Sequence, residues 1–333
     1  MTNISFDELK IKLFNILVKH DFEIENAELC SKIFAENTLV GVASHGINRF
    51  SAFINLVKSG HIIPNAKPTL VNSFGAWEQW DGNLGPGPLN AWRITERVIE
   101  LSKENGVGVA ALKNTNHWMR PGAFGWEAAE RGHILICWTN TIPIMPPWKA
   151  KTPAVGNNPI TMAVPRSNGH VVLDMALSQY AYGKLSTFRR EGKELPYPGG
   201  FDTEGKLSTN AAAIYDTQRS LPIGYWKGAG LAILFDLLAA ILSGGKSTND
   251  LGKTRVDSGM SQVFICFDPS KSYSAEAINN IADEIIESVK NAEPANKGAS
   301  VSYPGERIIE TRKKNLKDGI YIHPEIWEKI QRL

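Results

Sequence analysis

The sequence lacks the short motifs that mark several large enzyme classes. It contains no GxxxxGK(S/T) phosphate loop, no GxSxG nucleophile elbow and no HExxH or closely spaced histidine–cysteine pair. A P-loop nucleotide hydrolase is therefore excluded on pattern grounds, and neither nucleophilic catalysis nor a bound metal is supported. The GxGxxG fingerprint is also missing, so any nicotinamide cofactor of this chain is expected to bind outside a Rossmann fold.

Cysteine and net charge are scarce as well. The three cysteines, Cys30, Cys137 and Cys266, lie far apart and form no CxxC pair. This odd, dispersed set predicts neither a disulfide framework nor a zinc cluster, and it fits reduced thiols in the cytoplasm. With 36 basic and 34 acidic side chains the net charge is only +2, so no overall field favours nucleic acid or an anionic membrane as a partner.

Long apolar runs are few. The most apolar segment covers residues 231–242, includes Asp236 and is shorter than the ~20 residues that span a bilayer. We therefore predict a buried core helix there. Near the start, Asp7, Glu8 and Lys10 stand where a secretory signal would need an apolar segment, which predicts no signal peptide.

What is present is a change of pattern near residue 70. Before it, Ser5 and Glu8 form a capping box and apolar residues recur at helical spacing, which predicts helices only. After it, short apolar runs alternate with amphipathic segments, as in a sheet packed against helices. The predicted strands are 108–112, 134–138, 160–164, 170–173 and 262–267, and the predicted helices include 25–40, 90–104, 124–131 and a long helix capped by Ser274.

Both ends of the chain are predicted to share one domain. The tail is helical again from about residue 308, with Gly319 ending one helix and Pro324 in the first turn of the last. Terminal helices pack most economically on the opening helices, which predicts an α+β fold with a mixed, non-Rossmann sheet domain inserted in a helical domain. The predicted boundaries are 1–75 plus 308–333 for the helical domain and 76–307 for the sheet domain, with an excursion at about 186–250 that includes the glycine- and proline-rich loop 195–210.

The most informative segment is residues 43–50. Ser44 is a good helix cap, so His45 and Arg49 are expected one turn apart on a helix face, where free N–H groups favour an anion. Arg49 would then hold a carboxylate while His45 faces the atom beside it, which suits a 2-keto acid. A capped surface helix with a solvated arginine fits the same residues, so this segment alone leaves both interpretations open.

Two further positions carry candidate charges. Residues 224–230 are glycine-rich and precede the apolar helix, so their N–H groups and Lys227 would suit a phosphate. A glycine-rich turn with an exposed lysine is the alternative. Asp174 ends an apolar strand, where it would either balance the charge of His45 or cap the next helix.

The loop after the strand at 108–112 is rich in polar groups. Asn116, His117 and Trp118 together would suit a polyhydroxylated ligand, because they combine hydrogen-bonding groups with one flat ring. A lone loop histidine is nevertheless more often structural than catalytic.

Six dispersed motifs together resemble the malate/L-lactate/L-sulfolactate dehydrogenase family, which lacks a Rossmann fold. They occur in the family's order over nearly the whole chain, which makes the set far more specific than any single motif and favours the catalytic interpretation of His45. Within the family, residues 48–50, 116–120, 137–140, 145–148 and 224–227 look most like reductases of a 2,3-diketo sugar acid. The six motifs are residues 44–49, 81–85, 156–159, 173–176, 227–230 and 304–306.

The resemblance implies NADH-dependent reduction of 2,3-diketo-L-gulonate to 3-keto-L-gulonate (3-dehydro-L-gulonate) by a cytoplasmic homodimer, with NADP(H) as the alternative cofactor. It implies that His45 is the proton donor, and we expect the substrate to contact Ser44, Arg49, Asn116 and His117. It further implies a cofactor site made of His170, Val171, Val172, Leu173, Asp174, Met175, Ala176, Trp226, Lys227, Gly305, Glu306 and Arg307.

Two other functions compete with this one. The first is reduction or oxidation of another 2-keto or 2-hydroxy acid, such as malate, lactate, sulfolactate, ureidoglycolate or a cyclic imino acid, for which the polar loop 116–120 is a poor match. The second is a sugar-acid binding protein without catalysis, which would have no use for NADH.

Overall fold

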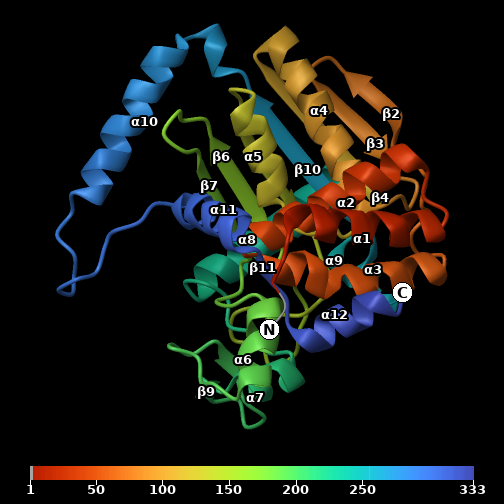
Figure 1. Ribbon diagram of the computed structural model, residues 1–333, viewed down its shortest axis with the longest axis vertical. Helices are drawn as coiled ribbons and strands as arrows, with labels where there is room; N and C mark the ends of the chain where they lie inside the picture. The colour runs from red at the N-terminus through yellow and green to blue at the C-terminus, as the bar shows by residue number, and fades with distance from the viewer. Residues whose placement is uncertain (1–2, 255) are drawn as a thin grey trace.

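The computed structural model describes residues 3–254 and 256–333, and Figure 1 shows their arrangement. The opening helices form because apolar residues recur every three or four positions. Ser5 accepts a hydrogen bond from the backbone N–H of Glu8, as expected for a capping box. The opening elements are α1 (Phe6–Lys19), α2 (Ile24–Leu39), the short 3₁₀ turn η1 (Ala43–His45) and α3 (Ile47–Lys58).

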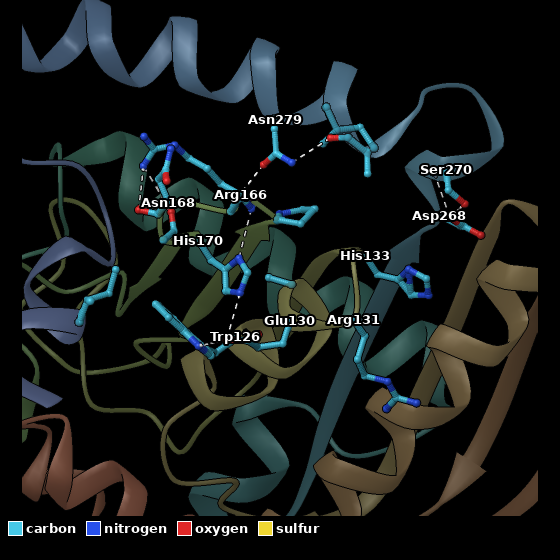
Figure 2. A pocket seen from close by; sticks show the side chains of 18 of the residues that line it. Trp126, Glu130, Arg131, His133, Arg166, Asn168, His170, Asp268, Ser270 and Asn279 are labelled. Atoms are coloured by element: carbon cyan, nitrogen blue, oxygen red, sulfur yellow. Dashed lines mark hydrogen bonds and ion pairs between the residues drawn. The ribbon is translucent and has the colours of Figure 1, made fainter. Parts of the chain in front are cut away.

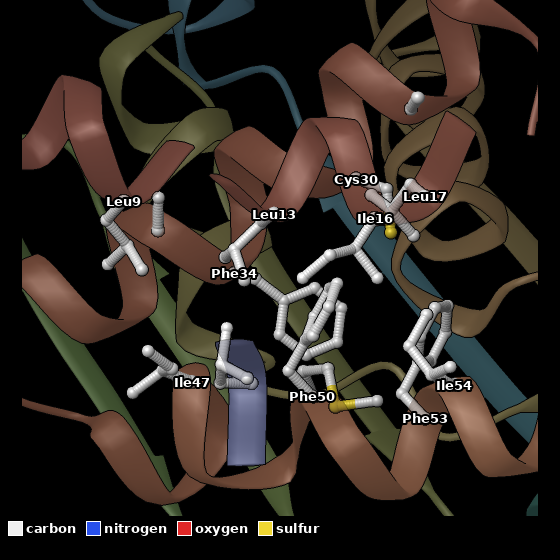
Figure 3. Close-up of a cluster of buried hydrophobic side chains, with 14 of the residues drawn as sticks. Leu9, Leu13, Ile16, Leu17, Cys30, Phe34, Ile47, Phe50, Phe53 and Ile54 are labelled. Carbon is white, nitrogen blue, oxygen red and sulfur yellow. The ribbon is translucent and has the colours of Figure 1, made fainter. Parts of the chain in front are cut away.

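The two ends of the chain meet beside these helices. Ile4 pairs with Ile320 in a two-stranded antiparallel sheet, and Ile330 joins the buried cluster of the opening helices. Figure 3 shows part of this cluster, in which the rings of Phe34 and Phe50 meet edge to face at 5.0 Å. The terminal elements are β1 (Asn3–Ile4), α11 (Glu306–Asp318), β11 (Ile320–Tyr321) and α12 (Pro324–Gln331).

A seven-stranded mixed sheet, counted over the described residues, forms the centre of the molecule. Its strand order is β2-β3-β4-β10-β5-β6-β7; β3 and β4 run parallel, and the other neighbours run antiparallel. A doubly wound parallel sheet is thus ruled out, and the predicted non-Rossmann α+β fold is confirmed. The strands are β2 (Thr69–Phe74), β3 (Trp77–Asp81), β4 (Val107–Asn116), β5 (Ile134–Thr139), β6 (Ile160–Val164), β7 (Val171–Met175) and β10 (Ser258–Phe267).

Helices cover both faces of the sheet. One face buries Leu112 and Phe264 under α4 and α5, and the other buries Ala111 and Val263 under α8. Neighbouring residues of β4 and β10 serve opposite faces because side chains alternate along a strand. The covering helices are α4 (Gly87–Asn105), α5 (Gly122–Glu130) and α8 (Trp226–Ser243).

The apolar run at residues 231–242 is not a buried core helix, contrary to the prediction. It lies inside α8, which buries Ala232, Phe235 and Ala239 against the sheet. The helix is long and apolar enough to cross a membrane by length and composition alone, but a third of it is buried on the sheet. Its other face exposes between 42% and 71% of five apolar side chains, namely Ile233, Leu234, Leu237, Leu238 and Ile241.

Smaller elements complete the chain. The predicted loop at 195–210 contains the short hairpin of β8 and β9. Along the chain, α6, this hairpin and α7 follow β7 and precede α8. In Figure 1, α10 stands apart from the main body of the molecule. These elements are α6 (Tyr182–Glu191), β8 (Gly200–Phe201), β9 (Leu207–Ser208), α7 (Ala211–Thr217), α9 (Thr248–Thr254), η2 (Pro269–Lys271) and α10 (Ala275–Lys290).

We propose the predicted division into a helical domain (1–75 plus 308–333) and a sheet domain (76–307). Separate hydrophobic clusters within the helices and within the sheet support it. Strand β2 pairs with β3 in the central sheet, although its residues fall inside the first of these ranges. A boundary just before residue 69 would therefore follow the strand pairing more closely.

Candidate active site

A sharp bend after α2 presents His45. The chain passes through η1 and Gly46 before α3 begins, and the hydroxyl of Thr38 fixes this bend by accepting a hydrogen bond from the Ile47 N–H at 3.0 Å. Ser44 lies inside η1, so it is not the helix cap that the sequence predicted; Gly46 precedes α3 instead. His45 and Arg49 consequently belong to two consecutive elements rather than to one helix.

Two imidazole rings face each other at this bend. His117, which directly follows β4, stacks on His45 with ring centroids 5.7 Å apart and planes inclined by 17°. Ser44 Oγ lies 3.2 Å from His45 Nδ1, which leaves His45 Nε2 for another partner. His117 Nδ1 accepts a hydrogen bond from the Met119 N–H at 3.0 Å, so neutral His117 carries its proton on Nε2. We call Ser44, His45, Arg49 and His117 the histidine corner.

The surroundings of both rings disfavour a positive charge on them. Burial, with the nearby cations Arg49 and Arg120, lowers the pKa of His45 to about 4. Burial, with Arg49 and His45, lowers the pKa of His117 well below its usual range. Both rings are therefore neutral near pH 7, and the corner as a whole favours an anion.

Arg49 is partly buried and ion-paired. Its Nη2 donates to a carboxylate oxygen of Asp257, which lies in the segment between α9 and β10. A guanidinium held by one carboxylate keeps further N–H groups for a second one. No sequence pattern indicated Asp257, because Arg49 and Asp257 lie 208 positions apart.

Asp174 makes its contacts away from His45. Its Oδ2 accepts a hydrogen bond from the Gly122 N–H at 2.9 Å and lies 3.7 Å from Nε of the buried Arg120. It therefore caps the start of α5 and neutralises a buried cation. Neither role considered from the sequence, a partner of His45 or a cap for the next helix, describes these contacts.

The loop after β4 is largely structural. The side-chain N–H groups of Asn116 donate to three backbone carbonyl groups and leave no free donor for a substrate hydroxyl. Trp118 is 1% exposed and packs edge to face on Phe264 in the sheet core, so the expected ligand-facing role of its ring is wrong. Of the substrate contacts predicted in this loop, His117 reaches the corner.

The three segments predicted to bind a cofactor meet along β7. At its start, the Val172 N–H donates to the Pro304 carbonyl at 2.9 Å; just beyond its end, the Ile223 N–H donates to the Leu177 carbonyl at 2.9 Å. The loop before α11 and the turn before α8 therefore lie at opposite ends of one strand. We call residues 170–176, 226–227 and 305–307 the β7 site.

Close backbone approach and exposed side chains characterise the β7 site. Gly305 has φ of +100°, and a Cβ there would lie 3.1 Å from the His170 carbonyl oxygen and from the Val172 nitrogen. Glycine is therefore required where this loop crosses the strand. At the other end, Trp226 is 64% exposed and Lys227 is exposed in the first turn of α8, so both are free to contact a ligand.

Some predicted cofactor residues already have protein partners. His170 Nδ1 accepts a hydrogen bond from the Arg166 N–H, and its Nε2 lies 3.3 Å from a carboxylate oxygen of Glu130. Glu306 forms an ion pair with Lys290 at the end of α10. These side chains hold the loops of the β7 site in place, which leaves the backbone and the exposed residues to meet a ligand.

A cavity of about 920 Å³ opens beside His170, as Figure 2 shows. It lies between α5, the turn that joins β6 and β7, and the first turns of α10. His133 is 4% exposed at one side, and neither of its ring nitrogens has a hydrogen-bond partner within the described residues. Other polar residues of the lining come from distant segments that no sequence pattern connects, among them Trp126, Glu130, Arg166, Asp268, Asn279 and Lys313.

The profile of the malate/L-lactate dehydrogenase family matches residues 4–331. The chain belongs to this family. A 2,3-diketo-L-gulonate reductase from Klebsiella pneumoniae (strain 342) is 41% identical over 331 residues, with 99% of each chain covered. The protein of the same name from Escherichia coli (strain K12 / DH10B) is 40% identical over the same length and with the same coverage.

Solved structures share the fold of this malate/L-lactate dehydrogenase family member. A sulfolactate dehydrogenase from Methanocaldococcus jannaschii superposes with a TM-score of 0.89 at 29% identity, over 99% of this chain and 96% of the other. A malate dehydrogenase from Entamoeba histolytica gives a TM-score of 0.94 at 23% identity, over 99% and 96%, and shows the fold alone. The family resemblance read from six motifs is thereby confirmed.

As a member of this family, the chain is an oxidoreductase of CH–OH groups that uses a nicotinamide cofactor and acts on a small-molecule acid. The β7 site fits such a cofactor. Lys227 supplies an exposed cation in the first turn of α8, which suits a pyrophosphate, and Trp226 offers an exposed flat ring. The N–H groups of Lys227 and Gly228 already donate to the carbonyls of Gly224 and Ile223, so the lysine side chain carries this fit.

Proposed function

We propose that the chain catalyses the NADH-dependent reduction of 2,3-diketo-L-gulonate to 3-keto-L-gulonate. The stacked His45 and His117 rings beside Arg49 are the observation that carries this proposal. Relatives named for this reaction, 40% and 41% identical over 99% of the chain, support it.

The histidine corner matches three consecutive groups of this substrate. A 2,3-diketo acid carries a carboxylate at C1, the reacting ketone at C2 and a second ketone at C3. Arg49 would bind the carboxylate through a charge-assisted contact, and His117 Nε2–H would donate to the C3 oxygen. His45 then faces the C2 oxygen between them, which favours a 2,3-diketo acid over a small 2-keto acid such as pyruvate.

His45 is the proton donor in this proposal. When bound, NADH supplies a hydride to C2, and negative charge develops on the attached oxygen. An acid within hydrogen-bond reach of that oxygen typically contributes ~10²- to 10⁴-fold to the rate. Ser44 Oγ holds Nδ1 of His45, so Nε2 remains to give its proton to the oxygen.

The substrate itself supplies the negative charge that His45 needs. Without it, partial burial and two arginines keep the imidazole neutral at neutral pH. A carboxylate bound at Arg49 offsets one of these cations and favours the protonated ring. Of the two carboxylates considered from the sequence, the substrate's own is the better supported, since Asp174 is bound to Arg120 and Gly122.

We assign the cofactor to the β7 site. A strand advances ~3.3 Å per residue, so residues 170 and 176 lie ~20 Å apart, which suits the length of a dinucleotide. The nicotinamide would lie at the end of β7 nearer the histidine corner. The adenosine would lie at the other end, near His170 and the adjoining cavity. Glu130, beside His170, favours ribose hydroxyl groups over a 2′-phosphate, which supports NADH rather than NADPH.

We further propose a homodimer in the cytoplasm. The exposed apolar face of α8 is the kind of surface that a second copy covers, because monomers rarely leave such a patch in water. All three cysteines are free and buried, which fits a reducing compartment. Light scattering coupled to size-exclusion chromatography tests the dimer, and Leu234→Glu should yield monomers if α8 is the interface.

The function is tested by following NADH absorbance with a panel of 2-keto and 2,3-diketo acids. We expect the highest kcat/KM with 2,3-diketo-L-gulonate and a lower value with NADPH. A higher kcat/KM with oxaloacetate, pyruvate, sulfopyruvate or a cyclic imino acid would assign the chain to another activity of the family. Binding of sugar acids without any NADH consumption would indicate a binding protein.

A further inference from the structure

A contact between α6 and η1 points to one more functional residue. Gly183, the second residue of α6, lies so close to Ser44 that a Cβ built on it would be 2.7 Å from Ser44 Cβ and 3.3 Å from Ser44 Oγ. Carbon atoms do not approach this closely without displacement. We propose that Gly183 is a positioning residue: its missing side chain sets the distance at which α6 meets Ser44 and thereby places the imidazole of His45.

The α6 side of this contact is firmly held. Leu185 of α6 is fully buried in a small cluster with Ala211 and Ile214 of α7. The hydroxyl of Tyr182 donates to the carbonyl of Ile144 at 3.1 Å. Because these contacts lie in the first turn of α6 and behind it, α6 cannot retreat without breaking them.

The η1 side is held as well. Asn37 of α2 donates a hydrogen bond to the His45 carbonyl at 3.0 Å, and the bend that follows is fixed by the hydroxyl of Thr38. An added methyl group at residue 183 would therefore act on the nearest movable atoms, which are those of Ser44. Ser44 Oγ is the atom that holds His45 Nδ1, so a displaced serine turns or releases the imidazole.

Displacement of this kind affects chemistry more than folding. Alanine forms helices better than glycine, so Gly183→Ala by itself favours α6. A misplacement of ~1 Å at reacting groups, in contrast, can reduce a rate ~10²-fold. The inference rests on the proposed role of His45, and it assigns to Gly183 a share in the alignment of that residue that no sequence motif indicated.

A set of substitutions distinguishes the effect of the contact between Gly183 and Ser44 from a general loss of stability. Gly183→Ala is measured alone, with Ser44→Ala, which keeps the opposing Cβ, and with Ser44→Gly, which removes it. Ser186→Ala, an exposed position on the same helix, is the control for α6. For each variant we measure kcat, the KM for the keto acid, the dissociation constant of NADH by fluorescence, and thermal unfolding.

We expect Gly183→Ala to lower kcat ~10- to 100-fold with an unchanged NADH dissociation constant. The same change should remain harmful with Ser44→Ala but lower kcat less than about threefold further with Ser44→Gly, because the clash is then gone. An equal loss of kcat in both serine backgrounds, or an undiminished kcat in Gly183→Ala alone, would overturn the proposal.

A readout without catalysis keeps the inference separate from the proposed function. The ring C–H signals of His45 in an NMR titration report the placement of this imidazole, and His45→Gln identifies them. We expect Gly183→Ala to shift these signals and their titration, and the Gly183→Ala, Ser44→Gly pair to match Ser44→Gly alone. Loss of the proposed function would appear as an inactive native protein with a normal titration, whereas an unchanged titration in Gly183→Ala would refute the role of Gly183.

Discussion

The histidine corner and the β7 site are built in opposite ways. In the corner, side chains are half-buried or buried, and contacts from several elements hold them: Ser44 on His45, the Met119 N–H on His117, Asp257 on Arg49. In the β7 site, backbone groups and a glycine define the surface, while Trp226 and Lys227 extend into solvent.

This difference corresponds to the two proposed tasks, catalysis in the histidine corner and cofactor binding in the β7 site. A group that must protonate one atom is useful only if its direction is fixed, which buried contacts achieve. A cofactor with a long, charged outline can instead be bound by many weak contacts along a strand. Substitutions in the corner should therefore act on kcat or on a single substrate group, and those in the β7 site should act on cofactor binding in small steps.

The strongest test of the comparison is His45→Gln. We expect kcat to fall ~10²- to 10⁴-fold because the proton donor is lost, with little change in the dissociation constant of NADH. Single-turnover measurements of NADH oxidation and a fluorescence titration give the two quantities. The control is His20→Gln, at the end of α1. Undiminished NADH oxidation in His45→Gln would refute the assignment of the corner to chemistry.

Arg49→Met should have the next largest effect. The loss of a charge-assisted contact of ~1.5–3 kcal/mol predicts a KM for the keto acid raised ~10- to 100-fold, with the KM for NADH nearly constant. Because the substitution leaves Asp257 unpaired, Arg49→Met with Asp257→Asn is the matched variant and should show the same KM. Equal increases in both KM values would argue against a carboxylate anchor.

The charge supplied by the substrate predicts two different pH profiles. In the free enzyme the pKa of His45 is about 4, so kcat/KM for reduction should decrease as the pH rises above this value. A bound carboxylate raises this pKa in the complex, so the decrease of kcat should occur at a pH at least about one unit higher. Profiles of both constants measured on the same samples test this, and coincident profiles would contradict it.

Lys227→Ala tests the β7 site and should have the smallest effect. An exposed charge contributes ~0.2–1 kcal/mol, so NADH should bind up to about fivefold more weakly and kcat should stay constant. The difference should shrink at high salt. Lys329→Ala, an exposed lysine of α12, is the control. An unchanged dissociation constant would remove Lys227 from the site, and a large fall in kcat would contradict the separation of chemistry from binding.

Local patterns were enough to predict much of the fold. The spacing of apolar residues located the opening helices and the strands near 134–138 and 160–164, because both periodicities depend on neighbours in the chain. The exposed face of α8 was missed since an apolar run does not tell whether the protein covers one side or all sides. The predicted cap at Ser44 was wrong because contacts from α2 decide the bend.

The site was predictable to the extent that it follows from single residues. Residue type alone was enough to select three candidates for keto-acid chemistry, namely His45, Arg49 and His117. Asp257 and Gly183 were out of reach, because their importance lies in contacts between elements that are distant in the sequence. Trp118 misled for a related reason: residue type alone does not distinguish a ring that faces a ligand from one that fills the core.

The pairing of β1 with β11 has a consequence for how the protein is made. Ile4 cannot pair until Ile320 has been synthesised. Helix α3, which carries Arg49, likewise packs on α12 near the end of the chain. A ribosome delivers the first helices long before these last residues, so the nascent N-terminal part remains without its closing layer until synthesis is almost finished. A chain truncated before residue 320 would therefore contain every candidate catalytic side chain but would lack α12, the helix that packs against α3 and so supports Arg49.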